Sequence, residues 1–543
     1  MKKNVLYLTV FCFLALLCSR TFAQQLTESN LPIVLINTFG QIIPDEEKIN
    51  ANMMIIDNGP GQINHVSDPP AWYNGSIGIE VRGASSSGYP QKPYALETRD
   101  LQGQDTNVVL FGWPEESDYV MLSHYGDKSL LRNELSFMLF SGMGHYASRY
   151  VWAEVMVNGE YEGIYLFGEK IKKDDYRVDI AKLTPADTSG TDLTGGYIYK
   201  IDYWDWSNSW LSPYHPIGFP SFDIHYVYYY PRLDEILPVQ KSYISSYVSA
   251  FEEALYSDHF KDPLTGYNKY IDVPSFIDYF LLNEVSRNND GFKKSYYFYK
   301  DRDDHNPLIK SGPVWDFDWA WKNIDECYIF RATDGSGWAY EVNNCYPDVN
   351  SPGYYVRLFE DESFLNALKC RWDSLRGSIF STDSLLAWVD QKVNYLWEAQ
   401  QRHFIRFPIA GDYAVPEVPP IPQTYQGEID KLKQWITLRM NWLDANMPGV
   451  CYTGVPYPAA SSFKPLVFPI PASEWVWVES SAFRVTAQLR IYDVTGHELT
   501  LPYEFNGTTF TLDVHMLNKG LYFFQVLNGN DMQCNGKFII NKP

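Results

Sequence analysis

Positive charge is scarce in this sequence, and the shortage excludes two classes of partner. Lys and Arg number 44 against 66 Asp and Glu, which gives a formal net charge of −22 over 543 residues. Nucleic acids and anionic membrane surfaces are bound by cationic patches, so neither is expected as a partner. The acidic balance favours divalent cations and basic polypeptides.

Cysteine is also rare, and its spacing argues against a zinc protein. There is no Cys-x-x-Cys pair and no His-rich spacing, so a structural zinc site of that type is not expected. Five cysteines follow residue 23: Cys327, Cys345, Cys370, Cys451 and Cys534. Cys327 and Cys345 bracket a loop-like stretch and are candidates for a disulfide in an oxidising compartment.

Long apolar runs are missing except at the start of the chain. Met1-Lys-Lys precedes an apolar stretch over 5–17, and Thr21-Phe-Ala23 offers small residues at the usual cleavage position. This pattern predicts a secretory signal peptide over 1–23. No later segment reaches the ~18 apolar residues of a membrane helix. We therefore expect an exported protein, secreted or at the cell surface, with no membrane span.

The chain is too long for one ordinary domain, and two or three are expected. Residues 31–180 alternate like strands around one helix over 128–141, for which Asp127 is a suitable N-cap. The Asn158-Gly159 pair predicts a hairpin turn between two further strands. Helical spacing then recurs in the middle of the chain, over 239–257, 273–287, 360–376, 384–402 and 427–445.

The most informative stretch runs from Asp290 to Asp318. An aromatic strand over 295–300, a turn and a second strand over 308–315 predict a hairpin, with Asp290 just before it and Asp316 just after it. Protein-kinase-type phosphotransferases are built this way: one carboxylate orients the acceptor hydroxyl and another holds the metal ion. Ser295 stands where their catalytic loop carries a metal-binding Asn.

Upstream, a Gly/Ser-rich loop begins at Arg82 and ends at Lys92. Its backbone N–H groups could bind phosphate, and Lys92 could pair with phosphate oxygens. Alone, such a loop is more often an ordinary turn with a solvated lysine.

Six motifs in order resemble the CotH kinase family over about 31–442. They are Arg82-Gly…Lys92-Pro-Tyr, Asp127-Lys-Ser-Leu-Leu-Arg-Asn133, Val157-Asn-Gly-Glu-Tyr-Glu-Gly-Ile-Tyr165, Glu169-Lys-Ile-Lys-Lys…Arg177-Val-Asp-Ile, Asn289-Asp290 and Gly312-Pro-Val-Trp-Asp-Phe-Asp318. The resemblance implies a secreted atypical protein kinase that uses ATP with Mg²⁺, Mn²⁺ or Ca²⁺ to phosphorylate serine on partner proteins, which we expect to be basic or serine-rich. It also implies an α+β fold with a bilobal kinase-like domain over 31–445, divided near residue 180.

Carried onto this sequence, the resemblance makes Asp290 the base that orients the acceptor. Asp316 becomes the principal metal ligand, with Ser295 and Asp318 as further candidates, and Trp315 packs beside it.

The nucleotide would be bound by the Arg82 loop and by Lys92. Glu134, on the helix, is expected to hold Lys92 as the helix Glu of ordinary kinases does. Glu169 would lie at the hinge between the lobes and contact the adenine through its backbone.

Departures from ordinary kinases keep alternatives open. No His-Arg-Asp triplet is present, and Ser295 is a poorer metal ligand than Asn. A catalytically inactive kinase-like binding protein or adhesin is one alternative, and the aromatic stretch 203–210 would suit protein or glycan contacts. A glycoside hydrolase with Asp290 and Asp316 as acid and base is another.

The C-terminal segment resembles a type IX secretion sorting domain. After a linker over 446–466, short strands predict a β-sandwich over 467–543. The resemblance rests on Leu489-Arg-Ile-Tyr-Asp-Val-Thr-Gly-His-Glu-Leu and Leu517-Asn-Lys-Gly-Leu-Tyr-Phe, while Ile470 replaces the usual Asn between two prolines. It implies a Bacteroidota-type export route with the type IX secretion machinery as a partner.

Overall fold

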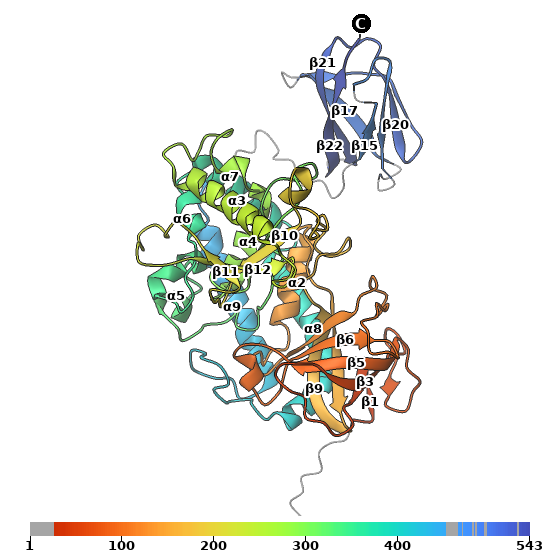
Figure 1. The fold of residues 1–543 in the computed structure, drawn as a ribbon, viewed down its shortest axis with the longest axis vertical. Coiled ribbons are helices and arrows are strands. Elements are labelled where there is room, and N and C mark those ends of the chain that lie inside the picture. Colours follow the sequence, from red (N-terminus) through yellow and green to blue (C-terminus); the bar gives the residue numbers. More distant parts are fainter. Residues whose placement is uncertain are drawn as a thin grey trace, which may run out of the picture. The chain divides into compact units, whose positions relative to one another are not determined.

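A computed structural model describes the protein over residues 26–451, 465–469, 471–480, 483, 486–493, 497–528 and 531–542. The signal peptide expected over 1–23 and most of the expected linker lie outside these residues. The chain divides into two compact units, Met1–Cys451 and Tyr452–Pro543. Figure 1 shows the first as a β-rich part joined to a helical part.

Seven strands of the first unit close into a barrel in the order β2-β3-β5-β6-β7-β9-β8. They are β2 (Ile33–Asn37), β3 (Ile49–Ile56), β5 (Tyr73–Val81), β6 (Tyr94–Arg99), β7 (Asp118–Ser123), β8 (Tyr150–Val157) and β9 (Glu160–Glu169). Alternate side chains such as Ile36, Ile77 and Phe167 are buried in a core of the barrel's own. Parallel pairing of β2 with β8 completes the closure, so every strand of the barrel is paired on both sides.

The helix expected over 128–141 begins later than predicted. α2 spans Arg132–Gly142. The preceding turn is held by Asp127, whose carboxylate accepts a hydrogen bond from the Arg132 backbone N–H at 2.8 Å and also pairs with the Arg132 guanidinium. Leu130 has a left-handed φ of 64°. Asp side chains stabilise such turns in competition with helix, which explains the late start.

The helical part contains the five predicted helices and a five-stranded sheet. The helices are α3 (Pro238–Tyr256), α4 (Val273–Ser286), α7 (Glu362–Arg376), α8 (Thr382–Arg406) and α9 (Tyr425–Asn446). The sheet, in the order β11-β12-β10-β13-β14, comprises β11 (Ser209–Leu211), β12 (His225–Tyr230), β10 (Tyr197–Ile201), β13 (Tyr296–Lys300) and β14 (Lys310–Ser311). β13 and β14 are the hairpin predicted between Asp290 and Asp316. β14 ends early because Pro313 cannot donate to a sheet ladder.

Short elements complete the first unit: β1 (Glu28–Ser29), β4 (Asn64–His65), α5 (Tyr328–Arg331), α6 (Tyr354–Leu358) and the 3₁₀ turns η1 (Ser86–Gly88), η2 (Thr191–Thr194), η3 (Tyr267–Lys269) and η4 (Ala339–Cys345). The predicted disulfide between Cys327 and Cys345 is present, and a second joins Cys370 to Cys451. Across the described residues, no helix combines the length and the hydrophobicity that crossing a membrane requires.

The second unit consists of two four-stranded sheets. One sheet contains β15 (Leu466–Phe468), β16 (Trp475–Glu479), β20 (Thr509–Asp513) and β19 (Tyr503–Phe505); the other contains β18 (Glu498–Leu499), β17 (Gln488–Tyr492), β21 (Gly520–Asn528) and β22 (Asp531–Ile540). Val476 and Leu512 of the first sheet share a core with Ile491 and Phe524 of the second. This is a sandwich with one side of each sheet buried.

A buried carboxyl group in α3 makes stability depend on pH. Burial raises the pKa of Glu252 from 4.5 to about 7, although hydrogen bonds from Tyr226 and Ser212 to its oxygens oppose the rise. Between these pH values the folded protein retains a proton that the unfolded chain releases, so this group lowers stability as pH rises through the window. The cost above pH ~7 is about 3 kcal/mol.

We therefore expect Glu252→Gln to increase the free energy of unfolding at about pH 8 by up to ~3 kcal/mol and to change it little at about pH 5. The amide can still accept from Tyr226 and can donate to Ser212. Thermal unfolding at both pH values measures the effect, with the exposed neighbour Glu253→Gln as control. An equal effect at both pH values would show that the buried charge is not the cause.

Candidate active site

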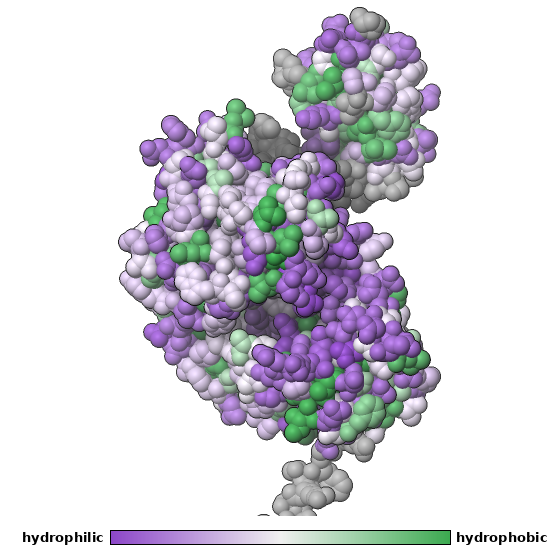
Figure 2. Space-filling view, in the orientation of Figure 1, coloured by the Kyte–Doolittle hydropathy of each residue, from purple (hydrophilic) through white to green (hydrophobic). Residues whose placement is uncertain are grey.

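A cleft of about 770 Å³ lies between the barrel and the helical part. Six segments line it: the loop after β5, the end of β7, the first turn of α2, the end of β10, the stretch from Asn289 to Tyr297, and the stretch from Trp315 to Trp319. Glu326 and residues 345–348 line it as well. Figure 2 shows the surface hollowed between these two parts. The cleft brings together Arg82, Asp290, Ser295, Trp315, Asp316 and Asp318, six of the nine site residues predicted from the sequence.

Asp290 lies in the turn that follows α4. The helix ends at Ser286, and Arg287 takes a left-handed φ of 43° as its C-cap. The Arg287 side chain is buried and donates to the carbonyls of Ala332, Ser336 and Phe330, so the turn is fixed to the segment beyond it. The Asp290 side chain is 25% exposed, and its Oδ1 lies 3.2 Å from Lys293 Nζ. A carboxylate is thus presented to the cleft from a rigid turn.

Asp316 occupies a left-handed backbone conformation with a φ of 68°. Asp tolerates this region better than most residues, but it remains strained and persists where the surroundings impose it. One constraint is Asn133 of α2, whose Oδ1 accepts a hydrogen bond from the Phe317 N–H at 2.7 Å. Since Phe317 separates Asp316 from Asp318, Asn133 holds the peptide between the two carboxylates.

The carboxylates in the cleft are close enough to affect one another's ionisation. Asp316 faces the open cleft but is enclosed by protein elsewhere; this burial, followed by the charges of Asp318 and Asp290, raises its pKa to about 8. Burial raises the pKa of Asp318 to about 6, against the opposing charge of Lys322. Crowded carboxylates of this kind are stabilised by a cation.

A ready-made metal site built from protein ligands alone is not found. In the part of the chain that the structure describes, no three His, Cys, Asp or Glu side chains are arranged to hold a metal ion. Mg²⁺ in phosphotransfer sites is commonly bound by only one or two carboxylates, with phosphate oxygens and water completing its shell. The Asp316 and Asp318 carboxylates, with the Ser295 hydroxyl in the same cleft, fit that donor set.

Arg82 provides positive charge opposite these carboxylates. Its guanidinium lies over the Trp315 ring, 5.3 Å from the ring centroid. None of the ion pairs in the described residues includes Arg82, whereas the other cations of the cleft are paired: Lys200 with Asp202, Lys293 with Glu326 and Lys294 with Asp348. A planar guanidinium without a carboxylate partner suits a bidentate contact with phosphate.

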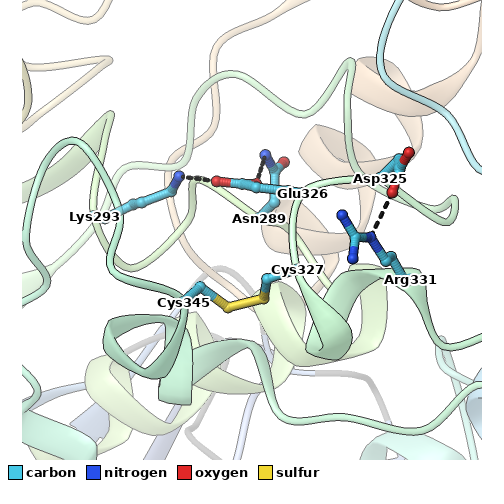
Figure 3. The surroundings of a disulfide bond; sticks show 7 residues. All are labelled: Asn289, Lys293, Asp325, Glu326, Cys327, Arg331 and Cys345. Carbon is cyan, nitrogen blue, oxygen red and sulfur yellow. Dashed lines mark hydrogen bonds and ion pairs between the residues drawn. A yellow bond between two sulfur atoms is a disulfide. The ribbon is translucent and has the colours of Figure 1, made fainter.

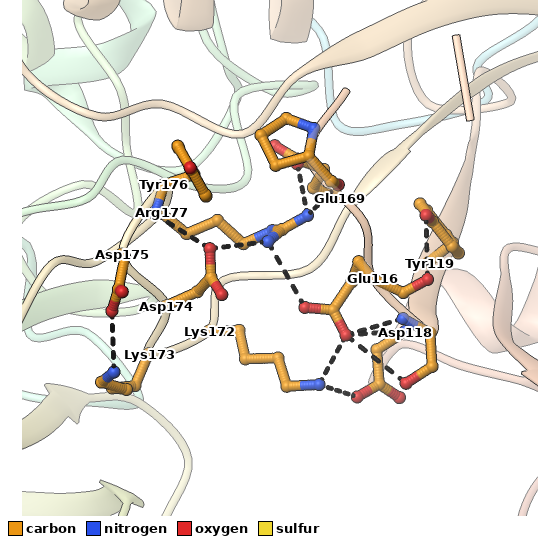
Figure 4. A network of polar contacts seen from close by, with 12 residues as sticks. Glu116, Asp118, Tyr119, Glu169, Lys172, Lys173, Asp174, Asp175, Tyr176 and Arg177 are labelled. Carbon is orange, nitrogen blue, oxygen red and sulfur yellow. Dashed lines mark hydrogen bonds and ion pairs between the residues drawn. The ribbon is translucent and has the colours of Figure 1, made fainter. Parts of the chain in front are cut away.

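Three predicted site residues lie elsewhere. Lys92 folds back on its own loop and donates to the Ser87 carbonyl at 2.7 Å. Glu134 is 3.5 Å from Lys392 instead of pairing with Lys92, and burial raises its pKa to about 7. Glu169 is fully buried in ion pairs with Arg149 at 2.7 Å and Arg177 at 2.9 Å, the latter within the network of Figure 4.

Sequence reasoning missed several residues of the cleft. They are Asn133, Lys200, Asp202, Lys293, Lys294, Glu326 and Asp348. Lys293 and Lys294 lie three and four residues after Asp290, and Glu326 precedes Cys327, so proximity in the sequence to Asp290 and to the disulfide was the available signal. Asp202 and Asp348 carry no such signal, because only folding brings them to the cleft.

Two family models match parts of the chain. A family model described as CotH kinase protein matches residues 79–443, which include every cleft residue named above. A second model, described as a secretion system C-terminal sorting domain, matches residues 466–541. No curated protein matches the chain. The first match begins within β5, so β2 and β3 of the barrel precede it.

Proposed function

The chain belongs to the CotH kinase protein family, and on that premise we propose that it transfers the γ-phosphate of ATP to serine hydroxyls of partner proteins with the help of a divalent cation. The observation that carries the proposal is one cleft that combines Asp290, Asp316 and Asp318 with Arg82, which forms no ion pair within the described part of the chain. The C-terminal sorting domain makes the protein a secreted or cell-surface protein exported by the type IX secretion machinery.

Asp290 is the residue that binds and orients the acceptor hydroxyl. Its carboxylate accepts the serine hydroxyl hydrogen, which orients Oγ toward the γ-phosphorus. As the new Oγ–P bond forms, the bond from phosphorus to the bridging oxygen breaks, ADP leaves and the hydroxyl proton passes to Asp290. Lys293 Nζ lies 3.2 Å from Asp290 Oδ1, so the carboxylate is held in place beside the space that the acceptor would enter.

Asp316 and Asp318 would hold the cation, with Ser295 as a further oxygen donor. When bound, a Mg²⁺ or Mn²⁺ ion supplies positive charge that neutralises the phosphate oxygens. The hydrogen bond from the Phe317 N–H to Asn133 matters here because it positions both carboxylates before any ligand binds. Such preorganisation is the main source of catalysis in phosphoryl transfer.

Arg82 is the cation proposed to contact the phosphates of the nucleotide. It opens the loop whose residues Gly83 to Ser86 also line the cleft, so the loop and the guanidinium border the same space. Lys92 is then a residue that shapes this loop through the Ser87 carbonyl. The Trp315 ring stabilises the guanidinium through a cation–π contact.

The test is phosphoryl transfer itself. Purified protein without residues 1–23 is incubated with ATP, Mg²⁺ or Mn²⁺, and a library of serine-containing peptides with basic and acidic flanks; phosphoserine is then identified by mass spectrometry. The proposal predicts metal-dependent phosphoserine that is absent with Asp290→Asn. Nucleotide binding without transfer to any peptide or to the protein itself would favour an inactive kinase-like binding protein.

A further inference from the structure

The disulfide Cys327–Cys345 closes a loop whose two ends both reach the cleft, because Glu326 precedes it and residues 346–348 follow it. We propose that Glu326 and Asp348, held together by this disulfide, form a clamp that positions the Asp290 turn, so that phosphoryl transfer requires the clamp and nucleotide binding does not. The catalytic part of this inference rests on the proposed function; the clamp itself can be tested without it.

Glu326 contacts the chain on both sides of Asp290. Its Oε1 lies 2.8 Å from Lys293 Nζ, and its Oε2 accepts a hydrogen bond from Asn289 Nδ2 at 3.0 Å. Figure 3 shows these two contacts beside the disulfide. Because Asn289 and Lys293 flank Asp290 in the sequence, a single side chain fixes the turn at two points.

Asp348 holds the other end of the same segment. Its Oδ2 lies 2.8 Å from Lys294 Nζ and accepts a hydrogen bond from the Tyr203 hydroxyl at 2.9 Å. Lys294 also donates to the Tyr203 hydroxyl at 2.8 Å. Lys294, Asp348 and Tyr203 therefore form a closed triangle at the rim of the cleft, and Lys293 contributes a longer contact of 3.9 Å to Asp348.

The clamp also determines whether Lys293 is shared between two carboxylates or contacts Asp290 alone. The Lys293 side chain is only 2% exposed, and its Nζ lies 3.2 Å from Asp290 Oδ1 and 2.8 Å from Glu326 Oε1. If Glu326 withdrew, the buried ammonium would be left with Asp290 as its nearest carboxylate. Lys293 would then compete with the acceptor hydroxyl for the carboxylate of Asp290.

The disulfide is the covalent link between the ends of the loop, whose other supports are contacts such as the packing of Tyr346 on Phe219 and Phe222 and the ion pair of Asp325 with Arg331. Glu326, Tyr346 and Asp348 are exposed, so burial does not hold them. The middle of the loop is anchored separately: the Glu284 carboxylate accepts hydrogen bonds from the N–H groups of Ala339 and Tyr340. Loss of the disulfide is therefore expected to release the ends of the loop while its middle stays folded.

The experiment compares Cys327→Ser/Cys345→Ser with Cys370→Ser/Cys451→Ser, which removes the other disulfide. Amide hydrogen exchange of the peptides covering residues 289–295 is measured in both, together with calorimetric ATP affinity and phosphoryl transfer. We expect faster exchange and a transfer rate reduced on the order of 10²-fold in the first variant, with ATP affinity retained. The second variant should match the wild type in all three.

Glu326→Gln keeps the disulfide and removes only the charge, so it tests the clamp even if the double variant folds poorly. It should reproduce the loss of transfer rate, and Glu326→Asp should restore part of it. Unchanged exchange and unchanged transfer in folded Cys327→Ser/Cys345→Ser protein would overturn the proposal. If the wild type transfers no phosphate but exchange is faster in Cys327→Ser/Cys345→Ser, the result would support the clamp and contradict the proposed kinase activity.

Reduction gives an independent check. Dithiothreitol donates two electrons and two protons to the Cys327–Cys345 sulfurs and itself closes to a cyclic disulfide. Transfer by the wild type and by Cys370→Ser/Cys451→Ser should fall on reduction, and the residual rate of Cys327→Ser/Cys345→Ser should not change. Equal sensitivity of all three proteins would contradict the assignment of the effect to this disulfide.

Discussion

Asp290→Asn should lower the rate of phosphoryl transfer by about 10²–10⁴-fold and leave the affinity for ATP nearly unchanged. The amide has the shape of the carboxylate, so the turn after α4 and its contacts are preserved. It cannot take the proton of the acceptor hydroxyl, and it turns a donor toward that hydroxyl in place of an acceptor. Steady-state transfer to a peptide acceptor and calorimetric titration with ATP separate the two effects.

The control for this prediction is Asp258→Asn, at an exposed Asp that follows α3 and lies outside the cleft. It should change neither the rate nor the affinity. A rate for Asp290→Asn close to that of the wild type would remove Asp290 from the reaction. Loss of ATP binding in the same variant would instead place Asp290 in the nucleotide site.

The second large effect is expected at Arg82. Arg82→Met removes the guanidinium while keeping a side chain that can pack on Trp315, and we expect ATP to bind ~10–100-fold more weakly, because charge-assisted hydrogen bonds contribute ~1.5–3 kcal/mol. Adenosine lacks phosphates, so its affinity should hardly change. Competition titrations with both ligands measure the difference.

Lys92→Met is the matched comparison, since it removes the cation that the family resemblance assigns to the phosphates. The Lys92 amine is bonded to the Ser87 carbonyl, so its loss should weaken ATP binding much less than the loss of Arg82. A larger effect at Lys92 than at Arg82 would show that the loop rearranges on binding and that the resemblance assigns the role correctly.

Much of the fold could be predicted because its signals are local. The helices α3, α4, α7, α8 and α9 follow apolar residues at helical spacing, and the Asn158-Gly159 turn specifies the hairpin of β8 and β9. Closure of the barrel could not be predicted, because it depends on a parallel pairing between β2 and β8 that no local pattern encodes.

The residues of the site also divide into those that a local sequence pattern reveals and those that depend on tertiary packing. Asp290 and Asp316 were identified because each flanks a hairpin that the sequence reveals. Glu134 was assigned to Lys92 from the arrangement in ordinary kinases, but α2 begins only at Arg132 and directs Glu134 toward Lys392. The left-handed backbone at Asp316 and its support by Asn133 depend on packing between distant segments, for which the sequence carries no signal.

One measurement tests the central claim most directly: calorimetric titration of the wild type and of Asp316→Asn with ATP, with and without millimolar Mg²⁺ or Mn²⁺. Asn tolerates the left-handed conformation, so the variant should fold as the wild type does. We predict saturable binding that requires the metal ion in the wild type and is lost in Asp316→Asn. Absence of binding with either metal, or equal binding by both proteins, would contradict a nucleotide–metal site in this cleft.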